Sequence, residues 1–377
     1  MKKALVIIPI SVIAILLVCF ILFQINISKA GIEIDGNCIN NNFNNTLVRA
    51  NKVVRQNNVI YYYYQPNGEH SKNGLYQISK TKTDMVYHPN ALLLKDPLAY
   101  YMQSSANKVL VASLNDAPIG VDLDESKKNY VVEWDTSRNT FCNTQYFNHF
   151  DDKIDYYYLI GEEIYFSTDD YIFLYSNGKY TKLLNVNEIY HYDDYNSNNN
   201  SYGFNGWYLA NNKIYYFSSS DGSFCSYDVI SKKTDKIFDK SYIQSKTKTK
   251  SIDELNSLFF ISNNKLILTV SNIVFAADTA TYKYYVVDLN NSDVSFIAEN
   301  SFNEDFSVNF YDDILYLGSD IDGLRAVNLN NKKIYTLTKN QADSICIVDN
   351  KYIYYIDSNQ SLYRVTDDGK SEEKIFG

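Results

Sequence analysis

The feature that most limits how this chain can fold is an internal repeat, found seven times between residues 46 and 377. Each copy contains an apolar strand, a tight polar turn, an aromatic second strand, and then a third and a fourth strand. The second strands read VIYYYY (59–64), KVLVASL (108–114), EIYFST (163–168), KIYYFSS (213–219), KLILTV (265–270), ILYLGS (314–319) and YIYYID (352–357). They recur about 50 residues apart, the spacing of one four-stranded propeller unit.

A first strand precedes each second strand, and two turn-forming residues join them. The first strands are predicted as TLVRA (46–50), LAYYM (98–102), IDYYYLI (154–160), GWYLA (206–210), SLFFIS (257–262), FSVNF (306–310) and SICIV (344–348). The joining pairs, such as Asn57-Asn58, Asn211-Asn212 and Asp312-Asp313, tolerate the positive φ of two-residue hairpins. After residue 24 we expect helix only as one turn near 251–256.

These repeats predict an all-β fold, a seven-bladed β-propeller of four-stranded antiparallel blades. A six-bladed ring is the alternative if the stretch 91–134 packs in another way. The second strands are continuously apolar, as expected for strands buried on both faces. We therefore interpret their tyrosines as packing residues and not as a ligand site.

The N-terminus has the pattern of a membrane anchor. Residues 4–23 carry no charge and follow Lys2 and Lys3, and such a run is long enough to cross a bilayer with its lysines in the cytoplasm. We predict a transmembrane anchor over 1–24, an Asn-rich tether over 25–45 and the propeller over 46–377. The protein is then a single-pass cell-membrane protein with its propeller outside the cytoplasm, or a secreted one if the chain is cleaved after Ala30.

Charge and cysteine content exclude several classes of function. The formal net charge of −9 disfavours nucleic acid as a partner. Cys38, Cys142, Cys225 and Cys346 are widely spaced, without the spacing of zinc ligands. Their pairing stays open, and Cys225 and Cys346 are expected to be buried thiols within strands. No nucleophile elbow, zinc-protease motif or phosphate-binding loop occurs in the chain.

The last repeat resembles a known family. Ile353-Tyr354-Tyr355 with Asp357, followed by Leu362-Tyr363-Arg364-Val365 and Gly369, is similar to the YWTD-type propellers of LDL-receptor-related proteins. The likeness extends to a bacterial surface family of unknown function described as LDL-receptor-related-like β-propellers, and it covers about residues 46–377. The resemblance implies a surface binding scaffold and supplies no catalytic residues.

The long insertions are predicted to share one rim of the ring. They are 135–153, 185–206, 240–256 and 271–282, and in a propeller such connections often serve binding. One insertion combines aromatic rings with carboxylates, a mixture that suits sugars or the cationic side chains of a peptide. Its candidate ligand-binding residues are Tyr190, Tyr192, Asp193, Asp194, Tyr195, Tyr202 and Trp207.

A second candidate site is the mouth of the central channel. Acidic residues are expected where first strands begin, namely Asp96, Asp155, Glu254, Asp305 and Asp343. Converging carboxylates repel one another unless a cation lies among them, so Ca²⁺ is the one cofactor considered. The alternative is that these residues only begin strands and hydrate the channel.

We expect a scaffold that binds a protein, peptide or carbohydrate, and not an enzyme. The alternative is a glycan hydrolase or lyase, which needs two suitably spaced carboxylates, with Asp155 and Asp343 as candidates. A structural role within a membrane assembly is a third alternative.

Overall fold

The structure is a computed structural model, and its described part begins at residue 52. The described residues are 52–56, 59–64, 72, 74–79, 82–87, 100–105, 108–113, 130–135, 138, 140–143, 156–190, 206–250, 259–262, 264–273, 280–302, 306–348 and 351–377.

The described strands pair into seven four-stranded antiparallel sheets, each formed by consecutive strands. Sheet 1 contains β1 (Val53–Gln56), β2 (Val59–Tyr64), β3 (Gly74–Ile78) and β4 (Thr83–Tyr87). Sheet 2 contains β5 (Tyr100–Ser105), β6 (Lys108–Ser113), β7 (Tyr130–Asp135) and β8 (Thr140–Asn143). Sheet 3 contains β9 (Tyr156–Ile160), β10 (Glu163–Ser167), β11 (Tyr171–Ser176) and β12 (Lys179–Asn185). Sheet 4 contains β13 (Trp207–Ala210), β14 (Lys213–Phe217), β15 (Phe224–Asp228) and β16 (Lys233–Phe238).

The remaining three sheets follow the same order. Sheet 5 contains β17 (Phe259–Ser262), β18 (Lys265–Ile273), β19 (Ala280–Asp288) and β20 (Val294–Phe302). Sheet 6 contains β21 (Phe306–Tyr311), β22 (Ile314–Ser319), β23 (Gly323–Asn328) and β24 (Ile334–Thr338). Sheet 7 contains β25 (Ser344–Val348), β26 (Tyr352–Ile356), β27 (Leu362–Thr366) and β28 (Glu372–Phe376).

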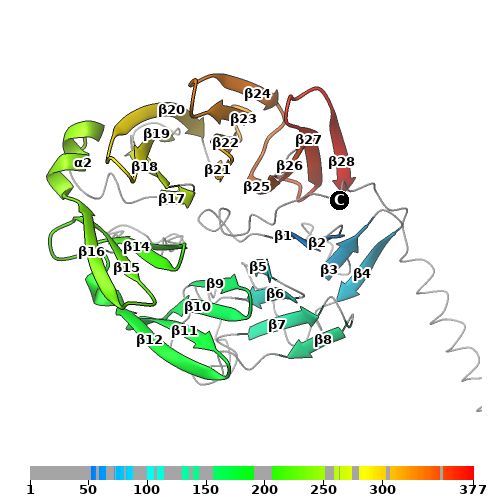
Figure 1. The fold of residues 1–377 in the computed structure, drawn as a ribbon. Helices are drawn as coiled ribbons and strands as arrows, with labels where there is room; N and C mark the ends of the chain where they lie inside the picture. Colours follow the sequence, from blue (N-terminus) through cyan, green and yellow to red (C-terminus); the bar gives the residue numbers. More distant parts are fainter. Residues whose placement is uncertain are drawn as a thin grey trace, which may run out of the picture.

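The sheets are arranged around a ring, with first strands nearest the centre and fourth strands at the perimeter (Figure 1). First strands of neighbouring sheets contact each other, and β1 contacts β25 of the last sheet. The prediction of an all-β propeller is therefore confirmed. The second strands lie where the sequence predicts them, whereas the first strand of sheet 1 is VVRQ (53–56), so the prediction of TLVRA (46–50) for it was wrong.

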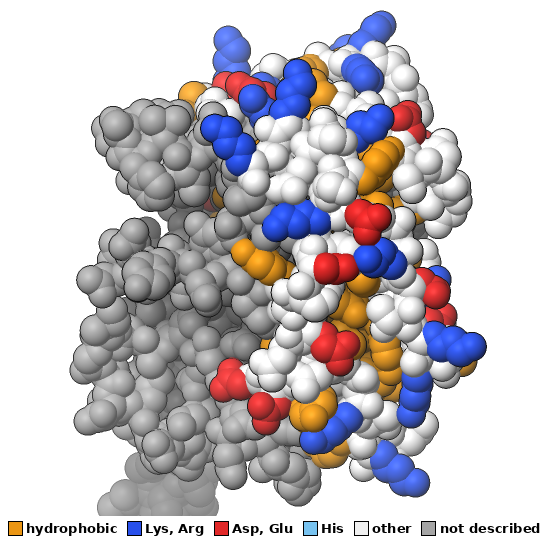
Figure 2. All heavy atoms as spheres, turned by 90° about the vertical axis from the view of Figure 1, so that its left-hand side faces the viewer, with side chains coloured by type: hydrophobic (Ala, Val, Ile, Leu, Met, Phe, Trp, Pro, Cys, Tyr) orange, Lys and Arg blue, Asp and Glu red, His pale blue; other side chains and the backbone are white. Residues whose placement is uncertain are grey.

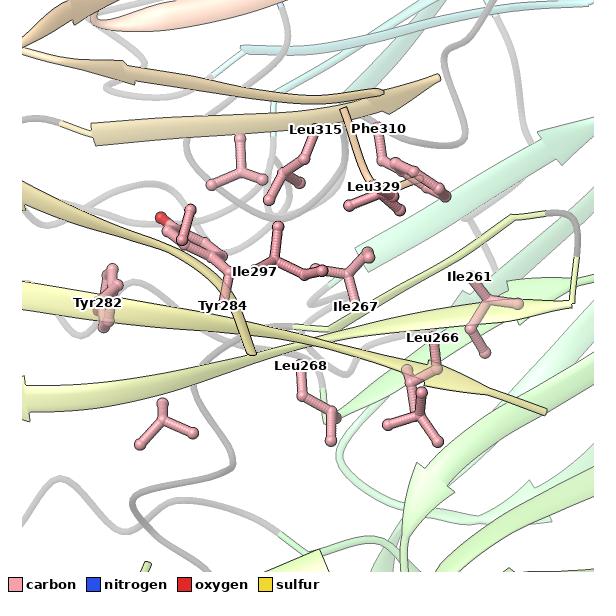
Figure 3. Close-up of a cluster of buried hydrophobic side chains, with 14 of the residues drawn as sticks. Ile261, Leu266, Ile267, Leu268, Tyr282, Tyr284, Ile297, Phe310, Leu315 and Leu329 are labelled. Carbon is pink, nitrogen blue, oxygen red and sulfur yellow. The ribbon is translucent and has the colours of Figure 1, made fainter. Parts of the chain in front are cut away.

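The second strands form the core of each sheet. In β2, β10, β14, β22 and β26 every residue after the first is buried. Tyr62, Tyr354 and Tyr355 are almost completely excluded from solvent, as expected for rings that pack between adjacent sheets. The largest cluster of buried side chains joins sheets 4, 5 and 6; part of it, with Leu266, Leu268 and Tyr284, is shown in Figure 3.

The two rims of the ring differ in their connections. The short-loop rim holds the turns from first to second and from third to fourth strands, which are two to five residues long. Asn211, Asn212, Asp312 and Asp313 all have positive φ, which confirms the predicted hairpin turns. The long-loop rim holds the other connections, including 186–206 and 239–258.

Three predicted insertions contain regular structure. The segment 135–153 includes β8 (Thr140–Asn143), and half of 271–282 belongs to β18 and β19, which pair as a hairpin as far as Ile273 and Ala280. The segment 240–256 begins with helix α2 (Lys240–Thr247). Helix α2 shows that the expectation of no helix other than a turn at 251–256 was wrong. The turn itself lies outside the described residues and stays a prediction.

Helix α2 lies at the perimeter between β16 and β20 (Figure 1). Its Ile243 is completely buried in the cluster that joins sheets 4 to 6. The Tyr242 hydroxyl donates a hydrogen bond of 2.7 Å to the Ser292 carbonyl, and the Tyr285 hydroxyl donates one of 3.3 Å to the Thr247 carbonyl. These contacts attach the helix to sheet 5.

Sheets 1 and 7 meet through side chains, and within the described part of the chain neither sheet takes a strand from the other. Tyr62 and Phe376 pack edge to face with ring centroids 5.8 Å apart. The Tyr62 hydroxyl donates to the Gln360 carbonyl, and Lys52 Nζ donates to Gln360 Oε1 at 2.7 Å.

The predicted anchor over 1–24 and the tether over 25–45 lie outside the described residues. From residue 52 onward, the described helices are all too short or too polar to cross a membrane.

Candidate functional site

The base of the insertion in 186–206 is fixed to sheet 4. After the short 3-10 helix η4 (Val186–Glu188), Ile189 forms an isolated bridge with Ser218. The Tyr190 amide donates to the Phe217 carbonyl at 2.7 Å, and the Ser219 amide donates to the Glu188 carbonyl at 2.9 Å. The insertion therefore begins beside the turn 218–223, which joins β14 to β15.

The two ends of the insertion meet at this base. A Cβ placed on Gly206 would lie 2.8 Å from Ile189 Cγ2 and 3.0 Å from the Tyr190 carbonyl oxygen. Gly206 also has a φ of +65°. Glycine is favoured here for two reasons, because a side chain would clash with neighbouring atoms and because the backbone is left-handed. Tyr190 and Gly206, which flank residues 191–205, thus lie close together; residues 191–205, called the excursion below, lie outside the described residues.

Trp207 belongs to the core and not to the surface of the rim. Its side chain is 1% exposed, and its ring lies 4.9 Å from that of Tyr158 in sheet 3. Burial between sheets 3 and 4 prevents contact with a ligand, so the prediction of Trp207 as a ligand-binding residue was wrong. The signal was present in the sequence, because Trp207 is part of the predicted first strand GWYLA.

The other candidates of the insertion divide between the base and the excursion. Tyr190 is half-buried and packs against the core cluster of sheets 4 to 6. The other five, which are Tyr192, Asp193, Asp194, Tyr195 and Tyr202, lie outside the described residues. Their role as ligand-binding residues stays a prediction.

A set of carboxylates that the sequence reasoning missed lies on the same rim. The described turns from second to third strands are 168–170, 218–223, 320–322 and 357–361. They contain six aspartates and, within these four turns, neither lysine nor arginine. The aspartates are Asp169, Asp170, Asp221, Asp320, Asp322 and Asp357. Glu188, at the base of the insertion, is exposed beside them.

Some of these carboxylates stabilise their own turns. Asp221 accepts hydrogen bonds from Lys236 Nζ at 2.8 Å and from the Ser223 amide at 2.9 Å. The Lys236 hydrogen bond is the main reason that the pKa of Asp221 lies well below its usual range. Asp357 accepts from the amides of Asn359 and Ser361 at 3.0 and 2.8 Å. Asp169 and Asp170 are exposed, and both carboxylates face solvent.

Of the five channel-mouth candidates, the described residues include Asp343 alone. Its amide donates to the Ile356 carbonyl at 2.9 Å, and its side chain is only 9% exposed. Asp96, Asp155, Glu254 and Asp305 lie outside the described residues. Within the described ranges, no three His, Cys, Asp or Glu side chains come together as a metal site would require. The calcium site and the Asp155–Asp343 pair of a glycan-cleaving enzyme stay predictions.

Of the four cysteines after residue 24, the side chains of two are described, and both are buried free thiols. This confirms the expectation for Cys225 and Cys346. Burial raises the pKa of the Cys346 thiol to about 12, which makes it a poor nucleophile at neutral pH. Cys38 and the side chain of Cys142 lie outside the description.

Among known proteins, only solved structures are similar to this chain. No family model matches the chain, and no curated protein matches it. Among solved structures, it is similar to the extracellular domain of a putative hybrid two-component system from B. thetaiotaomicron, at 10% identity and a TM-score of 0.48, over 90% of this chain and 44% of that chain. Less than half of that longer chain is matched.

Two further structures match more of their own length. The AfRom2 CNH domain is 8% identical with a TM-score of 0.47, over 90% of this chain and 98% of that one. BamB from Moraxella catarrhalis is 12% identical with a TM-score of 0.39, over 85% of this chain and 83% of that one. No functional argument follows from likenesses at this level.

Proposed function

We propose that the protein is a seven-bladed, membrane-anchored propeller outside the cytoplasm that binds a basic segment of a partner protein on its long-loop rim. The observation that carries the proposal is the difference between the rims. Connections on the short-loop rim have two to five residues, whereas those on the other rim include 186–206 and 239–258. Long connections on a rigid scaffold are the usual place for binding residues.

Charge supports a cationic partner over an anionic one. Asp169, Asp170 and Glu188 are exposed on the long-loop rim, and the four described turns there carry no positive side chain. Carboxylates on one face create a negative potential that steers cations toward it, and screening by salt weakens this attraction over about 8 Å at physiological ionic strength. The aromatic residues predicted to bind in 191–205 would add cation–π contacts.

Replacement of residues 191–205 gives a direct test. Because a Cβ on Gly206 would lie 3.0 Å from the Tyr190 carbonyl oxygen, a Gly-Ser-Gly linker can join the two sides. The probe is a fluorescent dodecapeptide of alternating lysine and tyrosine, titrated against the full-length chain in detergent. We expect at least tenfold weaker binding by the shortened variant and an unchanged melting temperature. Equal binding would contradict the role of the excursion.

A second pair of variants tests the carboxylates. One variant carries Asp169→Asn, Asp170→Asn and Glu188→Gln on the long-loop rim. The matched control carries Glu162→Gln, Asp312→Asn and Asp367→Asn on the short-loop rim, and therefore has the same net charge. Weaker peptide binding by the first variant alone is expected. Equal loss in both would show that only the overall charge attracts the peptide, and would overturn the rim as the site.

A further inference from the structure

The fourth strands form the perimeter of the ring, and most of them carry charges where they begin. Pairing with the third strand identifies three consecutive residues near the start of each fourth strand that are equivalent between sheets. At these positions β16 has Thr234, Asp235 and Lys236, and β28 has Glu372, Glu373 and Lys374. Asp84 of β4 corresponds to Asp235, and Lys182 of β12 corresponds to Lys236. Charged side chains on an exposed edge strand discourage pairing with another chain.

Strand β24 departs from this pattern. Its three corresponding residues are Ile334, Tyr335 and Thr336. All three are exposed, Ile334 by 50% and Tyr335 by 43%. The five residues of β24 include no charged side chain and three β-branched ones, a composition that favours strand pairing.

The other uncharged edges are shorter or contacted by a helix. Strand β24 itself contacts β27 of sheet 7, but Ile334, Tyr335 and Thr336 are exposed. At the same positions β20 has Val294, Ser295 and Phe296, but helix α2 contacts β20. Strand β8 (Thr140–Asn143) has four residues, and its side chains lie outside the description. Figure 2, which faces the α2 side of the ring, shows hydrophobic side chains interspersed among lysines and acidic residues on this perimeter.

The backbone of β24 has one paired edge and one open edge. The Asn328 amide donates to the Lys333 carbonyl at 3.0 Å, which turns the backbone polar groups of Lys333 toward β23. Because these groups alternate along a strand, Ile334 and Thr336 direct their N–H and C=O groups to the outer edge. Among the described strands, none pairs with β24 on this outer side of sheet 6.

Lysines flank this edge at both ends. Lys332 and Lys333 precede β24 and Lys339 follows it, and all three are exposed. None of them forms an ion pair with another described residue. An extended segment along β24 would therefore meet positive charge at both of its ends and an uncharged, β-branched middle.

We propose that the outer edge of β24 is a docking site for an extended, acidic-ended segment of a partner protein, which adds a fifth strand to sheet 6. Main-chain hydrogen bonds to Ile334 and Thr336 would provide affinity, and the flanking lysines would select acidic ends. A second copy of this chain fits less well, because antiparallel pairing of two β24 strands places Lys332 and Lys333 of one copy near Lys339 of the other. The edge of β24 lies on the perimeter of the ring, and of the three lysines only Lys339 belongs to a connection of the long-loop rim.

The test uses the full-length chain in detergent and the labelled peptide Asp-Glu-Val-Thr-Val-Thr-Val-Asp-Glu. The variant Ile334→Glu, Tyr335→Glu, Thr336→Lys gives β24 the pattern that β28 already has, so it should fold. We expect it to bind the peptide at least tenfold more weakly than the original chain. Thr234→Glu, which adds an acidic side chain at the corresponding position of β16, should change the affinity by less than twofold.

Three peptide controls define the mode of binding. A peptide with lysine in place of its acidic residues should bind at least tenfold more weakly, and one N-methylated at alternate residues should not bind. Hydrogen exchange should slow at Ile334 and Thr336 when the original peptide is bound. The proposal is overturned if no binding is seen at millimolar peptide, or if the triple variant binds equally. It is also overturned if light scattering shows a dimer that the triple variant abolishes, since the edge would then serve a second copy.

Discussion

The two rims of the ring are built from the same strands but follow different rules. On the short-loop rim one turn recurs: Asp228, Asp288 and Asn328 each accept backbone amides two residues on, at 3.1, 2.8 and 3.0 Å. On the long-loop rim, Asp221 and Asp357 also accept amides two residues on, at 2.9 and 3.0 Å, but the described connections there differ in length and one of them contains a helix.

This difference between the rims distinguishes turns that the fold requires from connections whose length can vary. In the recurring turn, the amides of Val229, Leu289 and Leu329 donate to carbonyls of the neighbouring first-to-second turns, at Asn212, Asn264 and Asp313. The two kinds of short turn are therefore bonded to each other in sheets 4, 5 and 6. Connections without this constraint are free to lengthen, and they do so on the opposite rim. If the short-loop rim is required for folding and the long-loop rim is not, substitutions on the two rims should change the free energy of unfolding by different amounts.

The largest effect is expected where the long-loop rim meets the core. Trp207→Ala should lower the free energy of unfolding by about 3–5 kcal/mol, because it removes a fully buried ring between sheets 3 and 4. Replacement of 191–205, which is separated from Trp207 by Gly206 alone, should change it by less than about 1 kcal/mol. Urea unfolding followed by far-UV circular dichroism measures both. Similar losses in the two variants would show that the excursion is part of the scaffold.

A smaller effect distinguishes two glycines. Gly206→Ala should cost about 1–3 kcal/mol, because the new Cβ meets Ile189 and Tyr190 in addition to the left-handed backbone. Gly178→Ala on the short-loop rim has a φ of +74° and no atom within 4 Å of the new Cβ, so only about 1 kcal/mol of backbone strain is expected. Thermal unfolding of the two variants compares them. A reversed order would indicate that the two ends of the excursion are not held together.

Much of the fold could be predicted because the same pattern of strands and turns occurs seven times in the sequence. The second strands were placed to within a few residues, since β-branched and aromatic runs between Asn and Asp turns have few other structures open to them. The error at TLVRA arose because VVRQ, a few residues later, has a similar apolar character, and the turn Asn57-Asn58 directly follows VVRQ. Turn position was the stronger signal.

Features that depend on tertiary contacts could not be predicted. Helix α2 has only Tyr242 and Ile243 as large apolar residues, too few for a helical period, and its contacts with Ser292 and the core keep it in place. The aspartates of turns such as 320–322 look like ordinary turn residues in the sequence. Only the three-dimensional structure shows that these turns lie together on the long-loop rim. The excursion 191–205 and four of the channel-mouth residues stay predictions.

A third prediction concerns the recurring turn itself. Asn328→Ala removes the side-chain oxygen that accepts from the amides of Asn330 and Asn331 at 3.0 and 3.2 Å, and should cost about 1 kcal/mol. Asn328→Asp should retain most of the stability, because Asp228 and Asp288 occupy the equivalent positions. Asp169→Ala, an exposed position on the other rim, should change the unfolding midpoint very little. A larger loss at Asp169 would mean that the long-loop turns also constrain the scaffold.

The smallest expected effect is a change in how the melting temperature depends on pH. On the short-loop rim, the hydrogen bond from Lys370 Nζ at 2.7 Å lowers the pKa of Asp368 to about 2. A carboxylate whose pKa is lower in the folded state stabilises above its unfolded pKa of about 4 and loses this contribution as the pH falls toward 2. Asp368→Asn should therefore lower the melting temperature slightly at pH 7 and not at pH 2. The pKa of Asp221 on the long-loop rim is lowered further, mainly by Lys236, so Asp221→Asn should have an effect of the same sign that persists to a lower pH. A pH-independent difference for either variant would assign its effect to lost turn geometry and not to the ion pair.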